Sequence, residues 1–231
     1  MKLAAMQPYF FPYLGYYQLA AGVDRFVFLD DAAFITRGFI HRNQLLLDGR
    51  PYRFTLPVAQ ASRNRSIAEH RFAGDLARLL QQLFHGYARA PYFEPVRQLV
   101  ASVWAAGDGN VAAVCAASIR GVFAYLGLPL RSDEASTLDV PGRGQERIIG
   151  LCHALGAGAY HNPPGGRALY SAEAFRQAGV RLCFLQPRLA PYHQGNAGQF
   201  FPGLSMIDVL MHNPPLAVRH MLGAASLEQA A

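Results

Sequence analysis

Residues 1–18 read MKLAAMQPYFFPYLGYYQ, and this stretch decides how the fold begins. The apolar run at residues 3–6 predicts a short buried β-strand. Pro8 and Pro12 cannot continue a central strand, so the chain must leave the sheet after this run. Aromatic side chains crowd the turn that follows. Because such side chains are costly to expose, we expect them to line a concave surface.

The next segments alternate between helix and strand. Residues 13–21 predict a helix that Gly22 ends, and residues 25–29 (RFVFL) predict a second strand. A strand, a helix and a strand within about thirty residues are typical of a parallel βαβ unit. Over the whole chain the pattern predicts an α/β fold: a mostly parallel sheet with flanking helices, a β-hairpin and a helical insertion.

Turn residues and apolar spacing predict the remaining elements. Asp48-Gly49 between two apolar runs indicates the hairpin. The other expected strands are 43–47, 52–58, 67–72, 159–162 and 180–186. The other expected helices are 75–88, 92–106, 110–126, 145–155, 171–178, 205–212 and 216–222. We predict one domain over 1–231, with an α/β core at 1–73 and 140–222, a helical insertion at 74–128 and a frayed tail after Gly223.

Composition limits the class of partner. The 231 residues are 52% hydrophobic, with a net charge of +6 and a pI near 9.5. The basic residues are scattered, which argues against nucleic acid and favours a small molecule that bears phosphate. Three cysteines without Cys-x-x-Cys spacing predict buried thiols, and no metal site is expected. We find no signal peptide or membrane-length apolar segment, so we expect a cytoplasmic protein without a membrane span. The oligomeric state stays open.

Polar side chains follow the ends of several predicted strands, where an open α/β sheet gathers its ligands. Gln7, Tyr9 and Tyr13 follow the first strand, and Asn162 and Arg167 follow a later one. We expect these five residues to bind substrate at a common rim. Ordinary turn chemistry is the alternative explanation for the same residue types.

Asp30 and Asp31 follow the second strand and are the first candidates for catalysis. Adjacent carboxylates repel each other, which raises the pKa of one of them towards the range of a general base. They also suit Mg²⁺ beside a substrate phosphate. The structural alternative is that one carboxylate caps a turn and the other faces solvent.

Two further groups offer polar side chains. In the first group, His41 is the candidate proton carrier, and Arg42 and Asn43 are substrate-binding candidates. On an extended chain Arg42 faces away from the other two, so a shared pocket requires a bend. In the second group, Asp208 shares a predicted helix face with Ser205 and is a substrate-binding candidate. A Ser–His–Asp nucleophile is not favoured there, because the chain lacks a Gly-x-Ser-x-Gly turn.

Seven segments, in order along the chain, resemble the WbqC-like family. The first is MQPYFFPYLGYYQ at 6–18. The others are VDRFVFLDD at 23–31, RGFIHRNQ at 37–44, APYF at 90–93, GQER at 144–147, AYHNPPGG at 159–166 and LSMIDVLMHN at 204–213. The resemblance implies a bacterial protein associated with O-antigen or other surface-polysaccharide pathways. It also implies chemistry on sugars or their carriers, such as transfer of an acyl or aminoacyl (glycyl) group to an amino sugar.

Together these observations give one leading hypothesis and two alternatives. The leading hypothesis is an acyl or aminoacyl transferase that acts on an amino sugar or nucleotide sugar and uses an acyl or aminoacyl donor. The first alternative is an ATP- and Mg²⁺-dependent amide ligase with a nucleotidylyltransferase-like fold, although the chain has Tyr16-Tyr17-Gln18 where such enzymes carry histidines. The second alternative is a non-catalytic sugar-nucleotide binding protein of a polysaccharide assembly complex.

Overall fold

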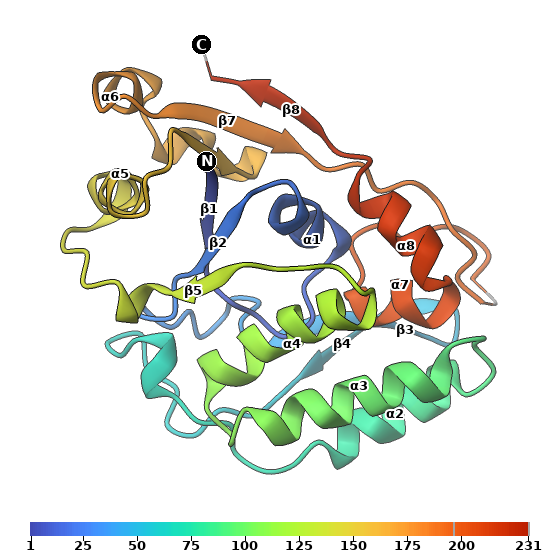
Figure 1. Ribbon diagram of the computed structural model, residues 1–231. Coiled ribbons are helices and arrows are strands. Elements are labelled where there is room, and N and C mark those ends of the chain that lie inside the picture. Colours follow the sequence, from blue (N-terminus) through green and yellow to red (C-terminus); the bar gives the residue numbers. More distant parts are fainter. Residues whose placement is uncertain (196, 231) are drawn as a thin grey trace.

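The computed structural model describes residues 1–195 and 197–230 and centres on a six-stranded sheet (Figure 1). The strand order is β5-β2-β1-β6-β7-β8, and every neighbouring pair is parallel except β7 and β8. The strands are β1 (Lys2–Met6), β2 (Arg25–Phe28), β5 (Ser132–Glu134), β6 (Ala159–Asn162), β7 (Arg181–Gln186) and β8 (Ser226–Gln229). The predicted α/β fold with a mostly parallel sheet is confirmed.

The chain begins with the predicted parallel unit. Helix α1 (Leu14–Ala21) connects β1 to β2, and the two strands pair in parallel from Leu3 opposite Arg25 to Met6 opposite Phe28. Tyr13 in extended conformation precedes the helix, and Gly22 follows it. The N–H of Gly22 donates to the Gln18 carbonyl at 3.0 Å, which closes the last turn.

Each face of the sheet packs against its own helices. On β1, Ala4 points towards α1, while Leu3 and Ala5 point to the opposite face, as strand alternation requires. The first face packs on α1, α4 (Val111–Tyr125), α7 (Met206–His212) and α8 (Pro215–Leu222). The second face packs on α5 (Gly144–Ala154) and α6 (Ala172–Gln177). Figure 1 shows α5 and α6 on the opposite side of the molecule from α7 and α8.

The predicted hairpin forms a separate two-stranded sheet. It consists of β3 (Arg42–Leu47) and β4 (Arg50–Thr55), with Leu47 opposite Arg50. Asp48 (φ 50°) and Gly49 (φ 71°) both lie in the left-handed region. Two positive φ values are what a tight type I′ turn requires, and aspartate and glycine tolerate them. Helix α2 (Ala77–Tyr87) packs on β3.

The expected helical insertion is present, and it ends in a strand that the sequence did not predict. Helices α2, α3 (Phe93–Ala106) and α4 follow one another, and Asn110 caps α4 by accepting from the Ala113 N–H at 3.0 Å. Strand β5 then pairs with β2 in parallel. Its three residues, Ser-Asp-Glu, lack an apolar run. They are held at the sheet edge by ion pairs such as Arg25–Asp133, at 2.5 Å.

Two local predictions are wrong. Residues 67–72 do not form a strand: Ile67–Glu69 is a 3₁₀ turn (η1), in which Ser66 and Glu69 form a reciprocal capping box. The tail after Gly223 is not frayed, because residues Ser226–Gln229 form β8 along the edge of β7. All four β8 side chains are exposed, so backbone hydrogen bonding rather than an apolar pattern places this strand.

The structure also bears on the cysteines and on the expected lack of a membrane-spanning helix. Cys115, Cys152 and Cys183 are free thiols and all three are buried, as predicted. No helix in the described parts of the chain is long and apolar enough to cross a membrane.

Candidate functional site

The carboxylate of Asp30 is part of a structural contact at the end of β2. It is only 5% exposed, and it accepts hydrogen bonds from the Ser136 N–H at 3.0 Å and from the Ser136 hydroxyl at 2.5 Å. Ser136 belongs to the 3₁₀ turn η2 (Ala135–Thr137) that follows β5. Asp30 therefore joins the ends of β2 and β5, and both of its oxygens already have donors.

The neighbouring carboxylate is paired as well. Asp31 forms a two-pronged ion pair with Arg147 of α5, with 2.9 Å between Nη1 and Oδ1. The Arg147 Nε–H donates to the Val140 carbonyl at 3.1 Å, which fixes the guanidinium plane. The hydrogen bonds to Asp31 raise the pKa of Arg147. A catalytic or Mg²⁺-binding role for Asp30 and Asp31 stays a prediction, and it requires these contacts to open.

Other predicted rim residues also have partners within the chain. The Gln7 side chain makes only a long 3.4 Å contact to the Ala33 carbonyl. Asn162 is buried and accepts from the Tyr160 hydroxyl at 3.4 Å. Arg167, in the 3₁₀ segment η3 (Pro164–Leu169), pairs with Glu228 of β8 at 2.5 Å. The carboxyl ends of β1 and β6, the strands that precede these residues, do lie at the same edge of the sheet. Substrate binding by Gln7, Asn162 and Arg167 stays a prediction.

The aromatic turn after β1 belongs mostly to the core. Phe10 and Phe11 are fully buried, so the sequence-based expectation that this pair lines a pocket is wrong. The Tyr9 hydroxyl accepts from the Tyr13 N–H at 3.3 Å, and burial raises its pKa. The Asn43 amide donates to the Phe10 carbonyl at 3.2 Å and to the Phe11 carbonyl at 2.6 Å. Asn43 therefore holds the turn in place.

His41 and Arg42 point to different surroundings, as strand alternation predicts. His41 is 8% exposed, its ring lies 5.3 Å from that of Phe34, and its Nδ1 has no hydrogen-bond partner among the described residues. Burial, and then the positive charge of Arg42, lower the pKa of His41 to about 4. The Arg42 Nε–H donates to the Gly38 carbonyl at 2.9 Å. His41 is therefore a neutral imidazole at pH 7.

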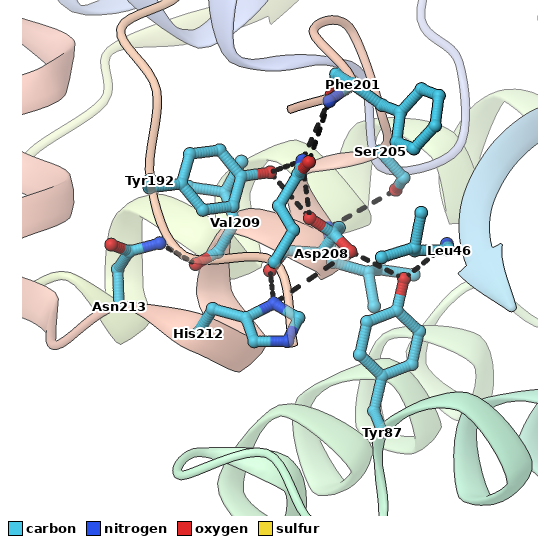
Figure 2. A network of polar contacts seen from close by, with 11 residues as sticks. Leu46, Tyr87, Tyr192, Phe201, Ser205, Asp208, Val209, His212 and Asn213 are labelled. Atoms are coloured by element: carbon cyan, nitrogen blue, oxygen red, sulfur yellow. Dashed lines mark hydrogen bonds and ion pairs between the residues drawn. The ribbon is translucent and has the colours of Figure 1, made fainter. Parts of the chain in front are cut away.

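Asp208 lies at the centre of a different polar network, which Figure 2 shows. Its side chain has no exposed surface, and it accepts from the Tyr87 hydroxyl at 2.8 Å and from the Tyr192 hydroxyl at 2.6 Å. Burial, and then the negative charge of Asp208, raise the pKa of both tyrosines, so both stay protonated donors. Gln194 adds a third donor at 3.3 Å and also bonds the backbone of Phe201 in both directions.

His212 completes this network one helical turn after Asp208. Its Nδ1 lies 3.0 Å from the Asp208 carbonyl and 3.9 Å from the Asp208 carboxylate. A carbonyl only accepts, so Nδ1 carries the proton and Nε2 keeps a lone pair. The His212 side chain is 6% exposed, and a Cβ added to Gly195 would lie 3.4 Å from Nε2. The basic nitrogen therefore faces the segment around Gly195.

The same imidazole borders a cavity of about 660 Å³. The lining comes from the end of α2, the turn before α3, the segment after β7 and the end of α7. Its residues are Phe84, His85, Gly86, Ala88, Arg89, Ala90, Pro91, His193, Gly195 and His212. This volume falls within the range of small-molecule sites. Three histidines and an arginine give the cavity proton-exchanging groups and positive charge.

Of the residues predicted from sequence, only Asp208 contributes to this cavity site, through His212. Ser205 does not act with them, since its hydroxyl donates to the Phe11 carbonyl at 2.8 Å and caps α7. Figure 1 places α7, which carries Asp208, on the far side of the molecule from α5, which carries the partner of Asp31. Tyr87 and Tyr192 were not anticipated. They lie 121 and 16 positions from Asp208, and neither carries a local signal.

We find no metal-binding arrangement in residues 1–195 and 197–230, taken as three or more converging His, Cys, Asp or Glu side chains. Fold and site together define an α/β protein with a His–Asp pair at a basic cavity.

Comparison with known proteins shows the family to which the chain belongs. The profile of the WbqC-like protein family matches residues 7–220, and the chain belongs to this family. It is 24% identical over 215 residues to "Uncharacterized protein Rv1507c" of Mycobacterium tuberculosis (strain ATCC 25618 / H37Rv), an alignment that covers 91% of this chain and 93% of the relative. No solved structure matches the chain significantly.

Proposed function

We propose that the protein is an acyl or aminoacyl (glycyl-type) transferase that acts on an amino sugar or nucleotide sugar, with His212 as the general base. The observation that carries this proposal is the placement of His212, whose Nδ1–H donates to the Asp208 backbone carbonyl and whose imidazole borders the cavity. The amine of an amino sugar is largely protonated near neutral pH and must lose a proton before it attacks. A fixed imidazole whose Nε2 has no hydrogen-bond partner among the described residues supplies that step.

The cavity lining supports a substrate with an anionic group. Arg89 forms no ion pair with any described residue, and His193 also lines the cavity. His85, a further lining residue, lies 3.2 Å from the Asp48 carboxylate. An arginine without a counter-ion suits the phosphates of a nucleotide sugar, which a guanidinium binds in two-pronged fashion. The exposed ring of Phe84 gives the opening an apolar edge for a sugar or base.

The lining also favours one reaction course. Its described residues include no serine, threonine or cysteine, so they offer no side chain of these types to carry the acyl group. The acceptor nitrogen would attack the donor carbonyl directly and form the new C–N bond. His212 would take the proton from that nitrogen, and the bond from the carbonyl carbon to the leaving group would break. The leaving group then receives the proton from His212.

The experiment is a turnover assay with a matched histidine control. Nucleotide-linked amino sugars are incubated with acyl and aminoacyl donors, and the mass increase of the sugar is followed. His212→Ala should reduce turnover by at least about 100-fold. His220→Ala alters an exposed histidine of α8 and should leave turnover unchanged. Undiminished turnover in His212→Ala would exclude His212 as the base.

The same assay separates the alternatives. A lining without a nucleophile equally suits a non-catalytic sugar-nucleotide binding protein, which would bind the sugar but give no product with any donor. Product that forms only when ATP is consumed would indicate the amide ligase. Family membership supports a role in O-antigen or other surface-polysaccharide biosynthesis, and a cytoplasmic location stays a prediction.

A further inference from the structure

A second cavity, of about 510 Å³, shares no lining residue with the His212 cavity. It opens over β6, β7 and β8 on the face that α1 covers elsewhere. Gly22, which ends α1, and Ala225, which leads from α8 into β8, border it. A Cβ on Gly22 would lie 3.3 Å from Leu185 Cδ1, so the helix end touches the sheet and closes one side.

Strand register explains why polar side chains gather here. Paired residues of neighbouring strands point to the same face, and Lys2, Ala159 and Arg181 form one row across β1, β6 and β7. Two residues further along, His161, Cys183 and Gln229 form the next row. Leu185 and Leu227 form the third. The cavity floor therefore changes from basic at one end to aliphatic at the other.

The basic end of the cavity carries two positively charged side chains that form no ion pair with a described residue. Lys2, the only lysine in the chain, and Arg181 form no side-chain ion pair with any described residue. The nearby carboxylate of Asp24 instead accepts from the Lys2 backbone N–H at 2.7 Å. Lys2 and Arg181 together outnumber the one nearby carboxylate, Asp24, so this end of the cavity attracts a ligand with negative charge.

His161 adds a buried polar atom without a partner. The residue is only 4% exposed, and its Nδ1 has no hydrogen-bond partner among the described residues. A buried polar atom of this kind normally finds a partner, because the unmade hydrogen bond is unfavourable. Burial, and then Lys2 and Arg181, lower the pKa of His161, so the ring is neutral at pH 7 and can bond a ligand as donor or acceptor.

We propose that this cavity binds an amphipathic anion, namely a small molecule with a terminal phosphate or carboxylate and an aliphatic body. The anionic head would lie between Lys2 and Arg181, within reach of His161. The aliphatic part would lie on Leu185 and Leu227. Cys183 forms part of the wall and is not a nucleophile here, because burial raises the pKa of its thiol.

The first measurement is calorimetry on the full chain with octyl phosphate, octanoate and inorganic phosphate. We expect octyl phosphate or octanoate to bind, and Arg181→Gln to weaken that binding by about tenfold. Arg63→Gln, which changes an exposed arginine in a loop, is the control and should bind like the unaltered protein. Circular dichroism on each variant verifies that it is folded.

The second measurement locates the ligand. The NMR resonances of the His161 imidazole are followed during titration with octyl phosphate, and they should shift in the unaltered protein but less so in Arg181→Gln. The proposal would be overturned if neither octyl phosphate nor octanoate binds. It would also be overturned if folded Arg181→Gln binds them as tightly as the unaltered protein does. Equal affinity for inorganic phosphate would also overturn it, since the aliphatic lining would then contribute nothing.

Discussion

The Tyr87 hydroxyl donates a 2.8 Å hydrogen bond to the Asp208 carboxylate, although the two residues are 121 positions apart in the chain. The same hydroxyl accepts from the Leu46 N–H at 2.7 Å. One tyrosine oxygen therefore links α2, β3 and α7 (Figure 2). This arrangement fixes Asp208, and Asp208 in turn fixes His212 through its carbonyl.

Removal of the carboxylate should destabilise the protein strongly. Asp208→Ala leaves the hydroxyls of Tyr87 and Tyr192 buried without their acceptor, so we expect the free energy of unfolding to fall by about 3 kcal/mol or more. Tyr87→Phe removes one donor to Asp208 and the acceptor of the Leu46 N–H, and it should lower the free energy of unfolding by about 2 kcal/mol. Urea unfolding followed by circular dichroism measures both. Similar small losses in the two variants would mean that the network contributes little to stability.

The ion pair between Asp31 and Arg147 is predicted to be structural. Arg147→Gln breaks a half-buried, two-pronged pair, so we expect the free energy of unfolding to fall by about 2 kcal/mol. Arg176→Gln breaks an exposed pair with Glu173 on α6 and should change it by less than about 0.5 kcal/mol. Asp31→Asn provides the functional comparison. If that variant keeps its stability but loses turnover, Asp31 rather than His212 is the base.

Asn43 should prove essential to the turn after β1. Asn43→Ala removes the donor that two buried carbonyls share and the acceptor of the Gln44 N–H, 2.8 Å away. We expect the free energy of unfolding to fall by about 2–3 kcal/mol, since each group is left buried without a partner. Asn64→Ala, in an exposed loop, should have a free energy of unfolding within about 0.5 kcal/mol of that of the unaltered protein. Comparable denaturation midpoints for both variants would contradict this role.

His41 should make stability depend on pH. Its pKa is about 4 in the folded protein and about 6.5 when unfolded, so between these values the unfolded chain binds more protons. Stability is therefore complete above about pH 6.5 and declines as pH falls towards 4, by at most about 3 kcal/mol. His41→Phe cannot titrate and should flatten this decline.

The control for the pH series is His220→Phe, which changes an exposed histidine and should keep the full decline. His161, whose pKa burial also lowers, should leave a smaller residual slope in His41→Phe. The measurement is urea unfolding at half-unit pH intervals. An unchanged slope in His41→Phe would show that another group dominates the acid response.

Much of the fold was predictable because its signals are local. The apolar spacing, Asn110 as a cap and the Asp48-Gly49 turn each determine structure through neighbouring residues. By contrast, β5 and β8 lack an apolar pattern of their own. They join the sheet through backbone hydrogen bonds to β2 and β7, which only the folded chain supplies.

In the candidate site, too, local relationships were predictable from the sequence and long-range contacts were not. The sequence showed that Ser205 and Asp208 share a helix face, because helical spacing is a local property. It did not show that Asp30 and Asp31 pair with Ser136 and Arg147, since those contacts join residues over 100 positions apart.

By itself, the sequence determined the class of fold, the opening βαβ unit and most helix boundaries, since these follow from periodicity, caps and turns over a few residues. Tertiary structure decided which polar side chains are already paired and which still face a cavity. A side chain's partners come from distant parts of the chain, so only packing assigns Asp31 to an ion pair and places His212 beside a cavity.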